Sequence, residues 1–346
     1  MTPSAPDALR AERTSRRALV ISSSYPQHAG DYSGHFVESE AVALAADGWA
    51  VTVLAPQAQR CDRGLNPRLL GYPGGDSFGP PGLLENIRRN PACCLRAAGF
   101  VAKTLSTVRS TAGVDLIVAH WLLPWTALLR EAYSTRIELV AHGSDVALLA
   151  TLPVLVRHRL GQRVLRNHFT LRFVSADLLS QFEQLCAVDL KDAARIQPSP
   201  IQLGNVPEHR IARSELGLAP TSQIALVVGR LIASKRIDVA LRALEKIDSL
   251  RPIVIGGGPE LGPLRQQFPG TSFLGELDRP TTLTWISAAD VLVSSSLLEG
   301  SPTAIREARA LGTPVVSLPC GDIPAWAASD YGLWLAHSSK GRLNPR

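Results

Sequence analysis

Short apolar runs recur along this chain, and segments with helical character separate them. Strands that alternate with helices are typical of βαβ units and parallel sheets. We therefore predict an α/β protein built from parallel sheets. The predicted strands cover residues 18–21, 49–54, 115–119, 137–141, 171–174, 224–229, 252–255, 272–274, 290–293 and 315–318.

The chain has 346 residues, a length that suits two domains better than one. Residues 196–206 read as the crossing between the domains, since the neighbouring prolines keep that segment extended. The sequence predicts an N-terminal Rossmann-like domain over residues 16–206 and a second one over residues 207–330. Residues 331–346 are predicted to be a polar tail, and residues 57–82, rich in Gly, Pro and Arg, a long loop.

One loop that leads into a helix, residues 299–307, combines an anion site with two carboxylates. Ser301 is predicted to be the N-cap and Pro302 the first helical residue. The helix N-terminus then lies at the carboxyl edge of a strand, where open α/β sheets bind ligands. Glu299 and Glu307 would repel a bare phosphate. A ligand with a central phosphate and flanking hydroxyl groups, such as a nucleotide-sugar, suits both features; the alternative is a surface helix with two ordinary glutamates.

Two motifs resemble the family-4 retaining glycosyltransferases of the GT-B fold. The first is Glu299-Gly300-x-Pro302-x-x-x-x-Glu307-Ala308-x-Ala310-x-Gly312-Thr313-Pro314-Val315-Val316. The second is Val228-Gly229-Arg230-Leu231-x-x-x-Lys235, which resembles the donor-phosphate loop of that family. Lys235 is predicted to open a helix that runs to about residue 247. The resemblance implies two Rossmann-like domains that face a cleft, the first on the acceptor side and the second on the donor side.

The resemblance also implies an activity: transfer of a hexose from a nucleotide-diphosphate sugar to a saccharide or lipid-linked acceptor, with retention of configuration. By it, Arg230 and Lys235 neutralise the donor diphosphate and Glu307 holds the ribose. Glu299 and His142, the latter in His142-Gly143-Ser144-Asp145, contact the transferred sugar and are the predicted catalytic residues.

The remaining predicted donor-binding residues also rest on the resemblance. The backbone of Ser301, Pro302 and Thr303 is expected near the sugar and phosphate, and Gly275 and Glu276 near the base. Gly30 and Gly34, in the loop after the first strand, are expected to approach the diphosphate or the acceptor; the alternative is that they are turn glycines.

No cofactor and no metal are expected. The chain has no Asp-x-Asp pair to hold a divalent ion against the diphosphate. The basic pair and the helix dipole are expected to stabilise the leaving diphosphate instead.

Three other functions stay open. Gly256-x-Gly258-x-x-x-Gly262, with Glu276 beyond it, imitates the dinucleotide-binding pattern of an NAD-dependent oxidoreductase. Its spacing is one residue too long, and another strand already precedes it in the same domain. A nucleotide-sugar epimerase is the second alternative. The third is a truncated, non-catalytic nucleotide-sugar binder, because the C-terminal helices of the family are predicted to be missing.

The net charge of +6 is concentrated partly in residues 82–110. A basic helical face there fits peripheral contact with an anionic membrane, and the alternative is a solvated face. Nucleic acid is not expected as a partner, because no aromatic residues interleave with these charges. We find no secretory signal, no apolar run of about 18 residues and no metal-binding spacing among the five cysteines. The predicted location is the cytoplasm, either free in it or peripheral on the inner face of the membrane.

Overall fold

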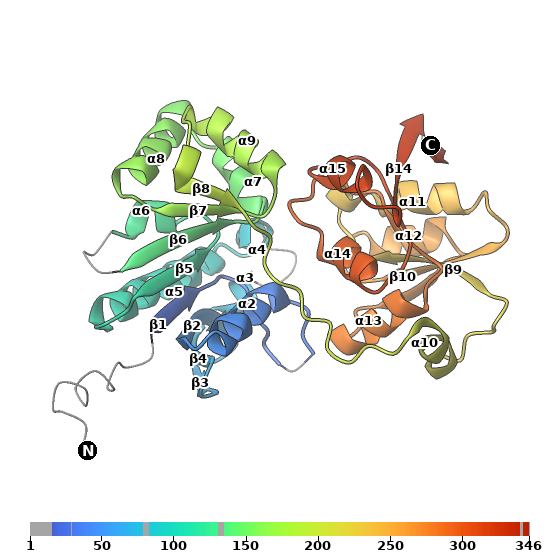
Figure 1. The fold of residues 1–346 in the computed structure, drawn as a ribbon, viewed down its shortest axis with the longest axis horizontal. Helices are drawn as coiled ribbons and strands as arrows, with labels where there is room; N and C mark the ends of the chain where they lie inside the picture. The colour runs from blue at the N-terminus through green and yellow to red at the C-terminus, as the bar shows by residue number, and fades with distance from the viewer. Residues whose placement is uncertain (1–15, 29, 79–82, 131–134, 340–341, 346) are drawn as a thin grey trace, which may run out of the picture.

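The computed structural model describes residues 16–28, 30–78, 83–130, 135–339 and 342–345, which form two α/β domains side by side (Figure 1). The N-terminal domain contains an eight-stranded sheet with the order β3-β4-β2-β1-β5-β6-β7-β8. All neighbouring strands are parallel except β3 and β4. The strands are β1 (Arg17–Ile21), β2 (Ala50–Gln57), β3 (Cys61–Arg63), β4 (Arg68–Pro73), β5 (Leu116–His120), β6 (Arg136–Ala141), β7 (Thr170–Phe173) and β8 (Ala194–Ile196).

The C-terminal domain contains a seven-stranded sheet with the order β11-β10-β9-β12-β13-β14-β15. It is parallel except for the last pair, β14 and β15. The strands are β9 (Gln223–Val228), β10 (Leu250–Ile255), β11 (Ser272–Gly275), β12 (Val291–Ser294), β13 (Val315–Ser317), β14 (Leu333–Ser339) and β15 (Arg342–Pro345).

Helices flank both sheets (Figure 1). In the N-terminal domain they are α2 (His35–Ala46), α3 (Gly75–Phe78), α4 (Leu83–Arg89), α5 (Ala92–Ser110), α6 (Trp125–Leu128), α7 (Ser144–Ala150), α8 (Val154–Arg166), α9 (Ala176–Cys186) and η1 (Lys191–Ala193). In the C-terminal domain they are α10 (His209–Glu215), η2 (Ala233–Lys235), α11 (Ile237–Leu244), α12 (Leu261–Gln267), α13 (Arg279–Ala288), α14 (Thr303–Ala310) and α15 (Ile323–Ala327).

Strand order places the candidate site. In each sheet the chain first adds strands on one side of its first strand and then continues on the other side, so the order reverses between β1 and β5 and between β9 and β12. Ligands of open α/β sheets bind beyond the carboxyl ends of the strands at such a point. The loops after β1 and β9 lie there. Buried residues such as Val20 and Leu226, each 0% exposed, fix both strands in their cores.

The end of the chain differs from the prediction. The polar tail predicted over residues 331–346 contains two strands, and β14 extends the sheet beside β13. Leu333 and Ala336 are 3% and 0% exposed, because they pack into the C-terminal core. The apolar run at residues 333–336 therefore forms a strand. Residues 340, 341 and 346 lie outside the described residues.

Three local predictions also change. The long loop predicted over residues 57–82 contains β3, β4 and α3; residues 79–82 lie outside the described residues. Ser301 is not the N-cap of α14, because Pro302 occupies that position and α14 begins at Thr303. Lys235 does not open α11, because it ends the 3₁₀ helix η2.

Candidate active site

The predicted phosphate loop follows β9 and rests on a glycine-rich turn. A Cβ on Gly256 would lie 1.9 Å from the Gly229 oxygen, and one on Gly258 would lie 2.4 Å from the Leu231 oxygen. Only glycine allows the two backbones to approach so closely. This packing gives the glycines of the dinucleotide-like pattern a structural role, namely support of the loop that presents Arg230.

The phosphate loop is also tied to the loop before α14. Lys235 Nζ forms an ion pair with the Glu299 carboxylate. The Ser295 hydroxyl donates to the carbonyl oxygens of Lys235 and Arg236, at 3.1 and 2.7 Å. The predicted diphosphate-binding lysine and the predicted sugar-binding glutamate therefore lie together, and each neutralises the other.

Glu307 is 4% exposed and lies between the two domains. Its Oε1 is 2.5 Å from Arg279 Nη1 and 3.5 Å from His35 Nε2. Burial raises the pKa of Glu307, but the neighbouring His35 and the guanidinium of Arg279 outweigh it, so the net pKa lies below its ordinary value. Arg279 Nη2 also donates to the Gln202 carbonyl in the interdomain segment, at 2.7 Å.

A cleft of about 370 Å³ lies between the loop after β1 and the loop after β11. Across it, the Tyr32 hydroxyl donates to Glu276 Oε1 at 2.8 Å. Burial and this hydrogen bond raise the pKa of the Tyr32 hydroxyl, so it is a neutral donor. The Arg279 amide donates to the Gly30 carbonyl at 2.9 Å. Gly275, which ends β11, has a φ of +76°.

Gly34 is the N-cap of α2 and has a φ of +67°, a conformation that favours glycine. A Cβ there would lie 2.4 Å from the Ser24 oxygen. The Ser22 hydroxyl donates a hydrogen bond of 2.5 Å to the same Ser24 oxygen. The turn therefore requires glycine for packing, whatever ligand its loop meets.

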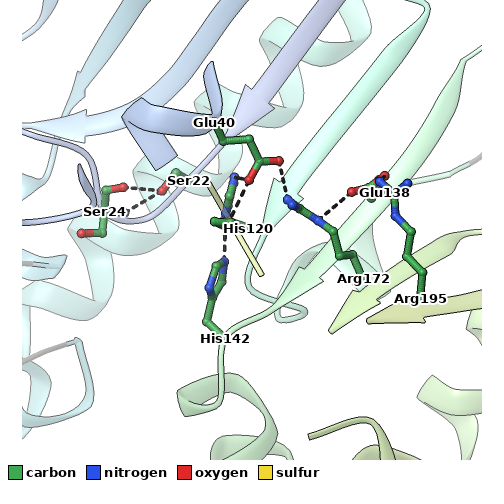
Figure 2. Close-up of polar contacts among 9 residues, drawn as sticks. Ser22, Ser24, Glu40, His120, Glu138, His142, Arg172 and Arg195 are labelled. Atoms are coloured by element: carbon green, nitrogen blue, oxygen red, sulfur yellow. Dashed lines mark hydrogen bonds and ion pairs between the residues drawn. The ribbon is translucent and has the colours of Figure 1, made fainter. Parts of the chain in front are cut away.

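His142 follows β6 and stacks on His120, with ring centroids 5.1 Å apart (Figure 2). Its Nε2 lies 2.9 Å from His120 Nδ1. Asp145 holds the backbone in place, because its carboxylate accepts from the amides of Leu122, His142, Gly143 and Val146 at 2.9–3.1 Å. Burial lowers the pKa of both histidines well below the ordinary value, so both rings are neutral near pH 7.

The motif before α14 meets the N-terminal domain directly. A Cβ on Gly300 would lie 2.8 Å from the His142 oxygen, so glycine permits the contact. Ser301 Oγ is buried and has no hydrogen-bond partner among the described residues. The Asp322 carboxylate, after β13, accepts from the amides of Ala176 and Asp177 at the start of α9, at 2.8 and 3.0 Å.

Among the predicted site residues, Glu276 lines the cleft, Glu307 contacts His35 of the N-terminal domain, and the His142 carbonyl lies against Gly300. Sequence reasoning missed several residues that hold them there: Tyr32, His35, Glu40, His120, Arg279, Ser295 and Asp322. His120 offered the clearest signal, because it ends a predicted strand as His142 does. The others act through contacts between distant segments.

Within the described residues, no group of three or more His, Cys, Asp or Glu is arranged to hold a metal ion. In the same part of the chain, no helix is long and apolar enough to cross a bilayer.

Comparison with known proteins identifies the C-terminal domain. Residues 222–340 match the family described as "Glycosyl transferases group 1". This part of the chain is a glycosyl transferases group 1 domain. The match includes both motifs, with Arg230 and Lys235 in one and Glu299 and Glu307 in the other.

The group 1 domain has relatives that also match the N-terminal domain. The teichuronic acid biosynthesis glycosyltransferase TuaC of Bacillus subtilis is 27% identical over 331 residues, which are 89% of this chain and 82% of TuaC. The D-inositol 3-phosphate glycosyltransferase of Mycolicibacterium paratuberculosis is 31% identical over 254 residues. That alignment covers 67% of this chain but 56% of the relative's length.

Solved structures support the predicted fold. Sucrose-phosphate synthase from Thermosynechococcus elongatus superposes with a TM-score of 0.71 at 18% identity, over 94% of this chain and 87% of that one. Anabaena HepE with UDP and glucose gives a TM-score of 0.64 at 16% identity, over 94% of this chain and 87% of that one. The predicted GT-B architecture around the group 1 domain is confirmed.

Proposed function

We propose that this protein is a retaining glycosyltransferase that moves a hexose from a nucleotide-diphosphate sugar to a saccharide or lipid-linked acceptor. The observation that carries the proposal is the Lys235–Glu299 pair. It joins the phosphate loop to the motif of the group 1 domain at the carboxyl edge of the sheet. Relatives point the same way: TuaC is named for teichuronic acid biosynthesis, and HepE has been solved with UDP-glucose.

The proposed roles follow from position. Arg230 and Lys235 bind the diphosphate, Glu307 the ribose, and Gly275 and Glu276 the base. Glu299 and His142 contact the hexose from the two domains, while the backbone of residues 301–303 and the turn at Gly34 line the donor. Lys235 pairs with Glu299. A diphosphate would therefore compete with that carboxylate for the lysine.

Binding is tested first. Thermal shifts with UDP-, GDP- and ADP-sugars identify the donor, because a specific ligand stabilises the folded state. Replacement of both Arg230 and Lys235 by Ala should then weaken binding of the matching nucleoside diphosphate at least tenfold, about 1.4 kcal/mol, and leave the nucleoside unchanged. Equal loss for both ligands would refute the diphosphate role.

Turnover distinguishes the remaining functions. The protein is incubated with the donor alone and then with saccharide and lipid-linked acceptors, and NMR of the anomeric proton follows the products. Transfer with retained configuration supports the proposal. Rapid isomerisation without acceptor indicates an epimerase, and binding without turnover indicates a binder. We propose metal-independent transfer; loss of activity in EDTA and recovery with Mg²⁺ or Mn²⁺ would contradict it.

We also propose that the N-terminal domain contacts an anionic lipid surface. A groove of about 340 Å³ has Tyr72 and Phe100 in its floor, and three cationic residues line it: Arg60, Arg96 and Lys103. An apolar floor with cationic walls complements an anionic amphiphile. Gly74 lines this groove and Gly75 lines the interdomain cleft, so the two hollows are neighbours.

Vesicle sedimentation tests the groove. A Cβ on Gly99 would meet nothing within 4 Å, so Gly99→Leu can fill the groove without removing a charge. We expect wild-type protein to bind phosphatidylglycerol vesicles better than phosphatidylcholine vesicles, and both Gly99→Leu and Lys103→Glu to reduce binding. Arg109→Glu, on the same helix outside the groove, is the control. A loss as large in the control would indicate a diffuse charge effect and contradict the groove.

A further inference from the structure

A chain of polar contacts runs from His142, which follows β6, into the core of the N-terminal domain (Figure 2). His120, at the end of β5, is 0% exposed. Its Nδ1 is 2.9 Å from His142 Nε2, and its Nε2 is 3.8 Å from Glu40 Oε2. His120 therefore lies between the carboxylate of Glu40 on α2 and the ring of His142.

Glu40 has two further partners besides His120. Arg172 on β7 pairs with its Oε1, and the Ser199 hydroxyl donates to its Oε2 at 3.1 Å. Beyond Arg172 lies Glu138, 2.8 Å away, which Arg195 also contacts (Figure 2). Arg136 Nη2 also lies 3.8 Å from Glu138 Oε2, so two buried carboxylates face three guanidinium groups. A buried carboxylate requires such compensation.

The carboxylate decides where His120 carries its proton. A neutral imidazole has one N–H and one lone pair. With the proton on Nδ1, the lone pair of Nε2 would face the negative Glu40 oxygen in a site shielded from water. With the proton on Nε2, the N–H dipole points toward that oxygen, an attraction that persists at 3.8 Å in a low-dielectric interior.

The tautomer of His120 then determines the tautomer of His142. If His120 carries its proton on Nε2, its Nδ1 is an acceptor, and the 2.9 Å contact requires the donor to be His142 Nε2–H. A neutral His142 has only this one ring proton, so its Nδ1 carries a lone pair and no hydrogen. Within the described residues, that Nδ1 makes no hydrogen bond. Both rings are neutral because burial lowers their pKa.

We propose that Glu40 and His120 are positioning residues that hold the proton of His142 on Nε2, so that Nδ1 of His142 is a hydrogen-bond acceptor for a hydroxyl group of the sugar ligand. His142 then orients a neutral hydroxyl and is not a cation beside the diphosphate. Its carbonyl lies against Gly300, one residue after Glu299, so the backbone of His142 lies beside the proposed sugar site. The sugar as partner rests on the proposed function; the tautomer does not.

The tautomer of His142 can be measured by NMR in protein without ligand and without turnover. Long-range ¹H–¹⁵N spectra of ¹⁵N-histidine-labelled protein distinguish a protonated from an unprotonated ring nitrogen, and a His142→Gln variant assigns the signals. We expect Nε2 of His142 to be protonated and Nδ1 to be unprotonated. A protonated Nδ1 in the wild-type protein would overturn the proposal. If UDP-glucose and the other nucleotide-sugars fail to bind, the proposed function fails while this result still stands.

Two substitutions of His120 form a matched pair. Asn can place its amide oxygen near the position of Nδ1 and accept from His142, whereas Leu cannot accept. We expect His120→Asn to keep the His142 tautomer and most of kcat, and His120→Leu to give a mixed tautomer and at least a tenfold loss of kcat at a similar nucleotide Kd. Near-UV circular dichroism checks that both His120 variants fold. If they do not fold, Glu40→Gln, which removes only the charge of Glu40, is used in their place. We expect Glu40→Gln to give a mixture of His142 tautomers as well. An unchanged tautomer in a folded Leu or Gln variant would overturn the positioning role.

Discussion

Glu299 balances the charge of Lys235. Glu299→Gln removes that balance and leaves the side chain almost the same size. We expect the variant to bind a nucleoside diphosphate a few-fold more tightly, because Lys235 is then free for phosphate. We expect kcat to fall at least tenfold, since the sugar contact is strongest in the transition state.

Calorimetric titration with UDP and a transfer assay measure the two effects. Asp330→Asn is the control, because Asp330 pairs with Arg309 in the same domain outside the proposed site. Weaker UDP binding together with unchanged kcat in Glu299→Gln would assign Glu299 to the nucleotide and not to the sugar.

The two buried histidines predict a pH dependence of stability. Burial lowers the pKa of His120 and His142 below the ordinary value of 6.5, so the unfolded chain binds protons that the folded chain does not. The free energy of unfolding should therefore be retained above about pH 6.5 and fall as the pH drops toward the folded pKa, by about 1.4 kcal/mol per pH unit for each histidine.

Urea denaturation between pH 7.5 and 5 measures the slope. His120→Asn removes one of the two groups, so its slope below pH 6.5 should be shallower by about half of the pair's contribution. An identical slope in wild-type and variant protein would show that His120 is not responsible.

At the scale of single elements, the turn from β1 into α2 depends on Gly34. Gly34 and Gly48 both have positive φ, +67° and +84°, but a Cβ on Gly48 meets nothing within 4 Å. Gly48→Ala should cost about 1 kcal/mol from backbone strain alone. Gly34→Ala should cost at least twice as much, because its Cβ would also meet the Ser24 oxygen at 2.4 Å.

Urea denaturation compares the two variants, and nucleotide binding shows whether the turn shapes the cleft. Similar losses of stability would indicate that the segment around Ser24 moves easily and that Gly34 is an ordinary turn glycine.

For the whole molecule, Asp322 links the domains by capping the N-terminus of α9. Ser175 caps the same helix from within the N-terminal domain, with its oxygen 3.3 Å from the Leu178 amide. Loss of either cap should cost about 1 kcal/mol of stability. Only Asp322→Ala should also loosen the arrangement of the domains, with a larger radius of gyration and a several-fold higher donor KM.

Small-angle scattering and donor kinetics on Asp322→Ala and Ser175→Ala separate these effects. Equal scattering from both variants and the wild-type protein would mean that other contacts, such as Arg279 with Gly30, hold the domains together.

The amino-acid sequence alone sufficed to predict the parallel sheets, because apolar runs between helices can be buried in few other ways. All ten predicted strands are present. It also determined the glycosyltransferase motifs, since local residues such as Arg230 and Glu307 carry them. It misjudged residues 331–346, because the burial of Leu333 depends on a neighbouring strand that the local pattern does not reveal.

The side-chain pairs of the site became known only from the three-dimensional structure. Lys235 and Glu299 are 64 residues apart, and Tyr32 and Glu276 are 244 apart, so no local pattern predicts either pair. The tautomer proposed for His142 likewise depends on Glu40, a residue of α2 that reads as an ordinary helical glutamate. Local sequence sets propensity and motif, but the charge, burial and proton position of a site depend on segments that only folding brings together.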